Sequence, residues 1–91
     1  MTVARRALVT GRVQGVFYRA TASSKARELA ITGSARNLPD GRVEVIAYGE
    51  IQAVRAFFDW LWIGSTASRV IAIEESDLEV GALVPERFTT K

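Results

Sequence analysis

The stretch LPDGR, residues 38–42, does most to limit the folds open to this chain. An Asp40-Gly41 pair is typical of a tight turn between two antiparallel strands. The segment 42–48 after the turn alternates between apolar and more polar residues, as expected of a strand with one covered face. The segment 32–38 is therefore predicted to be its partner in a hairpin.

Two helical segments flank this hairpin, one on each side. Tyr18, Ala22, Ala26 and Leu29 lie four, four and three residues apart, which puts them on one buried face of a helix over about 17–30. The second helix is predicted after the hairpin and ends near Gly64. Its apolar face comprises Ile51, Val54, Phe58 and Leu61.

Further strands are predicted over 5–13 and from 69 to about 73 or further, with a short edge strand at 87–90. Gly49 is expected to end the third strand. The order predicts an α+β split βαβ sandwich (βαββαβ), with two helices on one face of a mainly antiparallel sheet of four to five strands. With 91 residues, the chain is expected to form one domain, residues 1–91.

The composition restricts the chemistry. Without cysteine or histidine the chain has no disulfide, no thiolate nucleophile, no imidazole base and neither of the commonest metal ligands. No apolar run is long enough for a signal peptide or a membrane span, so a cytoplasmic protein without membrane partners is expected. A monomer without a nucleic-acid partner is expected as well. Residues 1–45 carry eight Lys/Arg against three Asp/Glu, a net charge of +5 that favours an anionic ligand, whereas residues 46–91 carry −3.

The stretch VTGRVQGVFYRA, residues 9–20, is the candidate for binding that anion. Gly11 and Gly15 lie between strand and helix, where glycine permits positive φ and a close approach to a ligand. Amides from Val13 to Arg19, at the positive end of a helix, could hold a phosphate, and Arg19 could grip two of its oxygens. Equally, the glycines could serve only the turn, and Arg19 could be a solvated charge.

Two motifs resemble a known family. GRVQGVFYR at 11–19 and GSARNLPDGRVEV at 33–45 resemble the two signature motifs of the acylphosphatase family. The resemblance implies a ferredoxin-like sandwich, hydrolysis of small-molecule acyl phosphates to a carboxylate and inorganic phosphate, and no metal or organic cofactor. It implies that Arg19 binds substrate and Asn37 orients the attacking water. The predicted phosphate-binding residues are Val13, Gln14, Gly15, Val16, Phe17, Tyr18 and Arg19.

Such a small set of side chains suits this reaction. An acyl phosphate is a mixed anhydride with a good carboxylate leaving group, so charge stabilisation and a placed water can suffice. Asn37 could instead cap the turn, and Asp40 is expected to support the hairpin. The remaining residues considered are expected to be solvated charges (Lys25, Arg36 and Arg42) or packing side chains (Tyr18, Trp60 and Trp62).

The chain departs from the family pattern away from Arg19 and Asn37. Ser34 stands where many members have tryptophan, and GSTAS at 64–68 replaces Gly-Pro-Pro-x-Ala. Two alternatives to an enzyme stay open. One is a non-catalytic module that binds RNA or another anion, for which the strands offer mainly Tyr48 and Phe88 as exposed aromatics. The other is a regulatory or scaffold role for a chain that is a relic of a domain in larger carbamoyl-transfer proteins, whose N-terminal part resembles this family.

Overall fold

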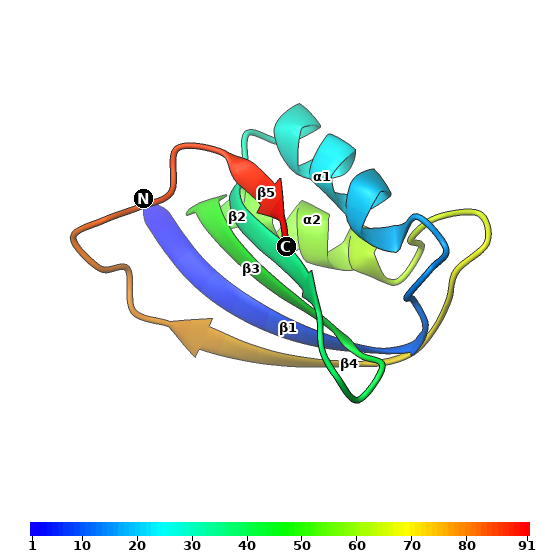
Figure 1. The fold of residues 1–91 in the computed structure, drawn as a ribbon. Coiled ribbons are helices and arrows are strands. Elements are labelled where there is room, and N and C mark those ends of the chain that lie inside the picture. The colour runs from blue at the N-terminus through cyan, green and yellow to red at the C-terminus, as the bar shows by residue number, and fades with distance from the viewer.

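The computed structural model describes residues 1–91 and has two layers, a five-stranded sheet and two helices on one of its faces (Figure 1). This confirms the predicted α+β, ferredoxin-like arrangement. No helix is long and apolar enough to cross a bilayer. The elements in chain order are β1 (Thr2–Arg12), α1 (Tyr18–Glu28), β2 (Thr32–Asn37), β3 (Val43–Glu50), α2 (Ile51–Leu61), β4 (Arg69–Leu78) and β5 (Phe88–Thr90).

The strands follow the order β4-β1-β3-β2-β5, and every neighbouring pair is antiparallel except β2 and β5. The predicted hairpin joins β2 to β3. Leu38 N–H donates to the Arg42 carbonyl at 2.8 Å, and Gly41, with φ 95°, donates back to the Leu38 carbonyl at 3.1 Å. The hairpin thus fixes the position of Asn37, the last residue of β2.

The core lies between the sheet and the helices. Tyr18, Ala22 and Ala26 of α1 are buried as predicted, whereas Leu29 is only partly covered. The alternation in β3 is also confirmed, since its helix-facing residues Val43, Val45 and Ala47 are fully buried. Burying these apolar side chains supplies the main driving force for folding.

On the opposite face of the sheet, Glu44 is buried as well, contrary to a simple alternation between covered and wet residues. Its carboxylate accepts hydrogen bonds from Arg6 at 2.7 Å and from Arg36 at 2.8 Å. A carboxylate tolerates this burial because both neighbouring strands provide a guanidinium.

Several predicted boundaries were wrong by a few residues. β1 begins at residue 2, and β3 continues through Gly49, which pairs with Val3 of β1. β4 runs on to Leu78, which pairs with Ala4 of β1, and Arg5 on β1 forms ion pairs across the strands with Glu75 at 3.1 Å and Asp77 at 2.9 Å. Cross-strand pairing therefore overrides the polar composition of this stretch.

The short last strand pairs in parallel with β2, opposite residues 33–35. Phe88 at its start is only 4% exposed and packs edge-on against Phe57, with ring centroids 5.7 Å apart. The expectation that Phe88 offers an exposed aromatic surface was wrong. β5 is too short to show periodicity, so its inward face was not evident from the sequence.

Candidate active site

The segment between β1 and α1, residues 13–17, has an unusual backbone. Gly15 has φ 74° and Phe17 has φ 62°, both in the left-handed region. An added Cβ at Gly15 would meet nothing within 4 Å, so the conformation and not crowding favours glycine there. Phe17 pays a conformational cost that a bulky residue rarely accepts, and such strain commonly marks functional sites.

Gly11 has a different role. Its φ is 140°, and it lies within β1 beside an irregularity in the pairing with β4. A Cβ there would collide with the Arg69 carbonyl oxygen. Gly11 therefore allows β4 to approach closely, and only Gly15 belongs to the loop itself.

The eight backbone N–H groups from residue 13 to residue 20 donate to no protein acceptor. Consecutive N–H groups in alternating backbone conformations form an anion-binding concavity, and the start of a helix adds partial positive charge. The first turn of α1 holds no acidic side chain to neutralise it, and Arg19 adds a full positive charge. This segment can therefore hold an anion.

Side-chain hydrogen bonds clamp the loop from both sides. Gln14 Nε2 donates to the carbonyls of Leu38 at 2.8 Å and Arg42 at 2.9 Å, which ties the loop to the β2–β3 turn. On the other side, Ser65 Oγ donates to the Val16 carbonyl at 2.6 Å. Because C=O and N–H point in opposite directions across a trans peptide, this bond turns the next N–H away from Ser65. The loop is thus held before any ligand binds.

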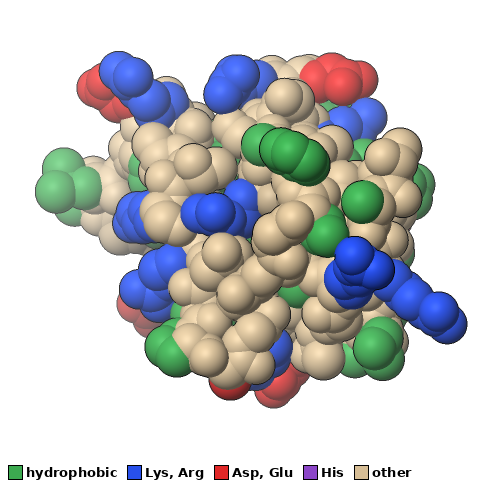
Figure 2. All heavy atoms as spheres, turned by 45° about the vertical axis from the view of Figure 1, so that its right-hand side comes forward, with side chains coloured by type: hydrophobic (Ala, Val, Ile, Leu, Met, Phe, Trp, Pro, Cys, Tyr) green, Lys and Arg blue, Asp and Glu red, His purple; other side chains and the backbone are tan.

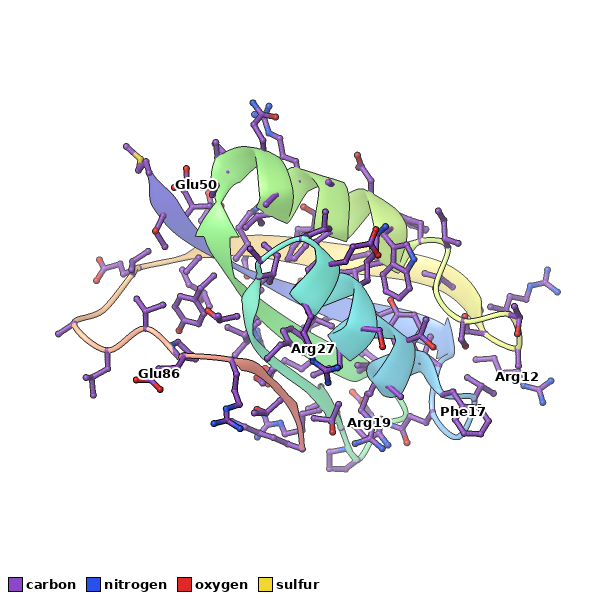
Figure 3. All side chains as sticks on the ribbon, turned by 90° about the horizontal axis from the view of Figure 1, so that it is seen from above. Arg12, Phe17, Arg19, Arg27, Glu50 and Glu86 are labelled. Atoms are coloured by element: carbon purple, nitrogen blue, oxygen red, sulfur yellow. The ribbon has the colours of Figure 1, made fainter.

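Arg19 lies in the first turn of α1, as predicted, and its side chain reaches the residue that follows β5. Its Nη1 donates to the main-chain oxygen of Lys91 at 2.7 Å, which engages one of its five N–H donors. Lys91 N–H in turn donates to the Ala35 carbonyl at 2.9 Å, two residues before Asn37. Figure 3 shows Arg19 and Phe17 at the same end of α1.

Asn37 lies on the helix-covered face of β2, in step with the buried residues Gly33 and Ala35. Its Oδ1 is buried, and no protein group donates a hydrogen bond to it. Gln14 contacts the residue after Asn37, and Arg19 reaches β2 through Lys91. The structure therefore brings the loop, Arg19 and Asn37 to one edge of the molecule.

Asp40 supports the hairpin, as predicted. Its carboxylate accepts from Arg42 N–H at 3.1 Å and pairs with the Arg42 side chain at 2.7 Å. These contacts, the backbone hydrogen bond first, lower the pKa of Asp40 below its ordinary value.

The other charges predicted to be solvated are ion-paired. Arg36 binds Glu44, Arg42 binds Asp40, and Lys25 binds Glu28 at 3.3 Å. All three side chains therefore form ion pairs with acidic residues outside the candidate site.

The aromatic residues pack beside the site. Tyr18 is buried and donates to the Leu61 carbonyl at 2.7 Å, and burial raises the pKa of its phenol. Trp60 stacks on Phe57 with ring planes 3° apart, whereas Trp62 is half exposed. Tyr18 and Trp60 thus have the packing role that the sequence predicts.

A hollow of about 580 Å³ opens beside the loop and continues along α1. Gly15, Phe17 and Arg19 line one part of it, and Ser23 and Arg27 of α1 line the remainder with Thr90 of β5. More Lys and Arg side chains than Asp and Glu side chains are visible in the view that brings the loop side forward (Figure 2). Arg27 was not predicted, although its spacing of four residues from Ser23 and eight from Arg19 indicates one helix face.

Comparisons with known proteins agree with this architecture. A family model described as Acylphosphatase matches residues 5–89. A protein named Acylphosphatase from Nitrosococcus oceani is 46% identical over 80 residues, which cover 88% of this chain and 90% of the relative. Another from Alkalilimnicola ehrlichii is 46% identical and covers 97% of both chains.

Solved structures agree as well. The crystal structure of acylphosphatase from Bacillus subtilis superposes with a TM-score of 0.93 at 32% identity, covering 100% of this chain and 99% of that one. None of these likenesses supports a non-catalytic RNA-binding module. A full-length HypF structure also contains the fold, over 12% of its length and at 22% identity, so that likeness concerns the fold alone.

Proposed function

Since the chain belongs to the acylphosphatase family, we propose that it hydrolyses small acyl phosphates to a carboxylate and inorganic phosphate. The observation that carries the proposal is the run of eight unpaired N–H groups at residues 13–20, which includes that of Arg19. Gln14 ties this run to the turn that follows Asn37. Several unpaired N–H donors together with one guanidinium suit a phosphoryl group that carries two negative charges.

The loop and Arg19 bind the phosphoryl oxygens. The N–H groups of residues 13–19 donate to those oxygens, and the Arg19 guanidinium, still with four free N–H donors, grips two of them. These donors are fixed in advance by Gln14 and Ser65, so little reorganisation is needed as charge shifts onto the phosphoryl and leaving oxygens. Arg19 and the loop thereby stabilise the transition state.

Asn37 orients the attacking water. Its buried Oδ1 accepts a hydrogen bond from the water and holds it in line with the bond between phosphorus and the acyl oxygen. The water oxygen forms the new bond to phosphorus, and the carboxylate leaves with the electrons of the broken bond. A phosphate oxygen of the substrate accepts the proton from the water. These steps require no general base from the protein and no covalent enzyme intermediate.

The test uses benzoyl phosphate and measures phosphate release with a metal chelator present. Wild-type protein is expected to remain active, and Arg19→Ala and Asn37→Ala should each lose activity by about 100-fold or more. Arg12→Gln is a matched control, because Arg12 is exposed, lies near the loop and forms no ion pair. Folding of each variant is checked by circular dichroism.

Normal turnover by a folded Arg19→Ala or Asn37→Ala protein would contradict the assigned roles. Activity that disappears with the chelator and returns with a divalent metal would contradict the metal-free mechanism. A cytoplasmic location, a monomeric state and the lack of a nucleic-acid partner stay predictions. Light scattering tests the monomer, and a salt-dependent gel shift with RNA would contradict the last prediction.

A further inference from the structure

The hollow beside the loop at residues 13–17 is longer than is needed to hold a phosphoryl group alone. It extends from Gly15 and Phe17 along α1 to Arg27 and is bounded across from the helix by Thr90. Arg27 is eight residues beyond Arg19, which corresponds to about 12 Å along the axis at 1.5 Å per residue. Both arginines therefore line one hollow. Arg19 lies beside the loop at residues 13–17, and Arg27 lies near the other end of α1 (Figure 3).

Arg27 carries a charge that no carboxylate neutralises. Its Nη2 donates to Ser23 Oγ at 3.0 Å, and Ser23 is only 5% exposed, so the guanidinium is held against the helix at the lining of the hollow. Glu28, the nearest acidic residue in sequence, pairs with Lys25 instead. Glu86 lines a neighbouring hollow with Arg27 and Arg87 but forms no ion pair with either.

We propose that Arg27 is a specificity-determining residue that binds a carboxylate at the far end of the acyl chain. The inference rests on the proposed hydrolysis and adds the substrate class, namely acyl phosphates of dicarboxylic acids. With the phosphoryl group at residues 13–19, the acyl chain extends along α1, and its terminal carboxylate accepts hydrogen bonds from the planar fork of Arg27. Ser23 keeps that fork in place.

A simpler role for Arg27 is to complement the negative end of the α1 dipole, because it lies in the last turn of the helix. The two roles predict different results. A contribution to the helix dipole affects stability and is indifferent to the substrate, whereas a carboxylate contact changes the preference between two substrates that differ only in that group.

The experiment compares adipoyl phosphate with hexanoyl phosphate, which have six carbons each and differ only in a terminal carboxylate. For the wild-type protein, KM for adipoyl phosphate should be about fivefold lower, as expected of a partly exposed ion pair, while kcat is similar. In Arg27→Gln the ratio of the two kcat/KM values should fall to about one. In Arg27→Glu the preference should reverse.

Arg55→Gln is the matched control, since Arg55 is exposed on α2, forms no ion pair and does not line this hollow. It removes the same net charge and should keep the wild-type ratio. Equal KM values for both substrates in the wild-type protein, or a wild-type ratio in Arg27→Gln, would overturn the assignment while leaving hydrolysis intact. No hydrolysis of either substrate, nor of benzoyl phosphate, would instead refute the proposed function and this inference with it.

Discussion

Two turns of this molecule use their polar backbone groups in opposite ways. In the turn at 38–42, three of the four N–H groups donate to acceptors within the turn itself: Leu38 to Arg42, Gly41 to Leu38, and Arg42 to the Asp40 carboxylate. In the segment 13–20, none of the eight N–H groups has a protein acceptor. Both turns contain a glycine with positive φ in open space, Gly41 and Gly15.

Whether the N–H groups of a turn are paired distinguishes a structural turn from a ligand-binding one better than the presence of a glycine with positive φ does. A turn whose donors are satisfied internally has only to connect two strands, and Asp40-Gly41 does that. A turn that leaves its donors unpaired, yet is clamped through Gln14 and Ser65, is fixed in a form that suits a ligand. Variants of paired residues in the two turns can test this distinction.

The largest effect is expected from comparing Gly15→Ala with Gly41→Ala. Each places a Cβ where nothing lies within 4 Å but where φ is positive, so each should lower the free energy of unfolding by about 1–2 kcal/mol. Only Gly15→Ala should also lower kcat/KM for benzoyl phosphate, by about tenfold or more, because the relaxed loop misdirects its N–H groups. Urea denaturation and phosphate-release kinetics provide both measurements.

Gly81→Ala is the control for this pair, since Gly81 is exposed and has no positive φ in the left-handed region. Gly81→Ala should change neither the free energy of unfolding nor kcat/KM for benzoyl phosphate. An equal loss of activity in Gly15→Ala and Gly41→Ala would mean that the two turns do not differ in function.

An intermediate effect is expected when the link between the two turns is cut. Gln14→Glu keeps the size of the side chain but removes both donors to the Leu38 and Arg42 carbonyls. Two hydrogen bonds of about 1 kcal/mol each are lost, so the free energy of unfolding should fall by about 2 kcal/mol. Since Asn37 immediately precedes this turn, kcat should fall several-fold.

Gln52→Glu on α2 makes the same chemical change at an exposed residue that forms no side-chain hydrogen bond, and should be neutral. Full activity in Gln14→Glu would show that the clamp is unnecessary for the placement of Asn37.

The smallest effect concerns pH and the turn at 38–42. The pKa of Asp40 lies below 3.8 in the folded protein, so its contribution to stability is present above about 3.8 and is lost as the pH falls through the lowered value. Asp40→Asn should therefore lower stability slightly at neutral pH and flatten the decline in acid, without loss of activity. Denaturation series at several pH values can check this, with exposed Asp59→Asn as the control. An Asp40→Asn protein with the wild-type pH dependence would contradict it.

Much of the architecture could be predicted from local patterns. The Asp40-Gly41 turn and the helix-facing residues of α1 and β3 each depend on neighbours in sequence. They are confirmed, except that Leu29 is only partly covered and that Glu44, on the other face of β3, is buried as well. The two motifs identified the family, which the matches over most of the chain confirm. Gln14 of the loop contacts Leu38, the residue after Asn37, whereas the roles assigned to Arg19 and Asn37 stay predictions.

What local patterns could not predict depends on contacts between distant segments. Gln14 was predicted to contribute an amide, but its side chain binds carbonyls 24 and 28 residues away. The extension of β4 to Leu78 depends on its pairing with the first strand, and Phe88 is buried where it packs against Phe57 of α2. Arg27 was missed for another reason, since an exposed arginine becomes informative only once a hollow is seen beside it.

The pairing of the last strand has a consequence for protein synthesis. The loop at 13–20 and Arg19 leave the ribosome early, but β1 pairs with β4 through Ala4 and Leu78, and Arg19 contacts Lys91, 72 residues later. Such long-range closure makes folding slow relative to a helical protein of this size. A nascent chain therefore carries the phosphate-binding sequence without its completed surroundings until β5 has emerged.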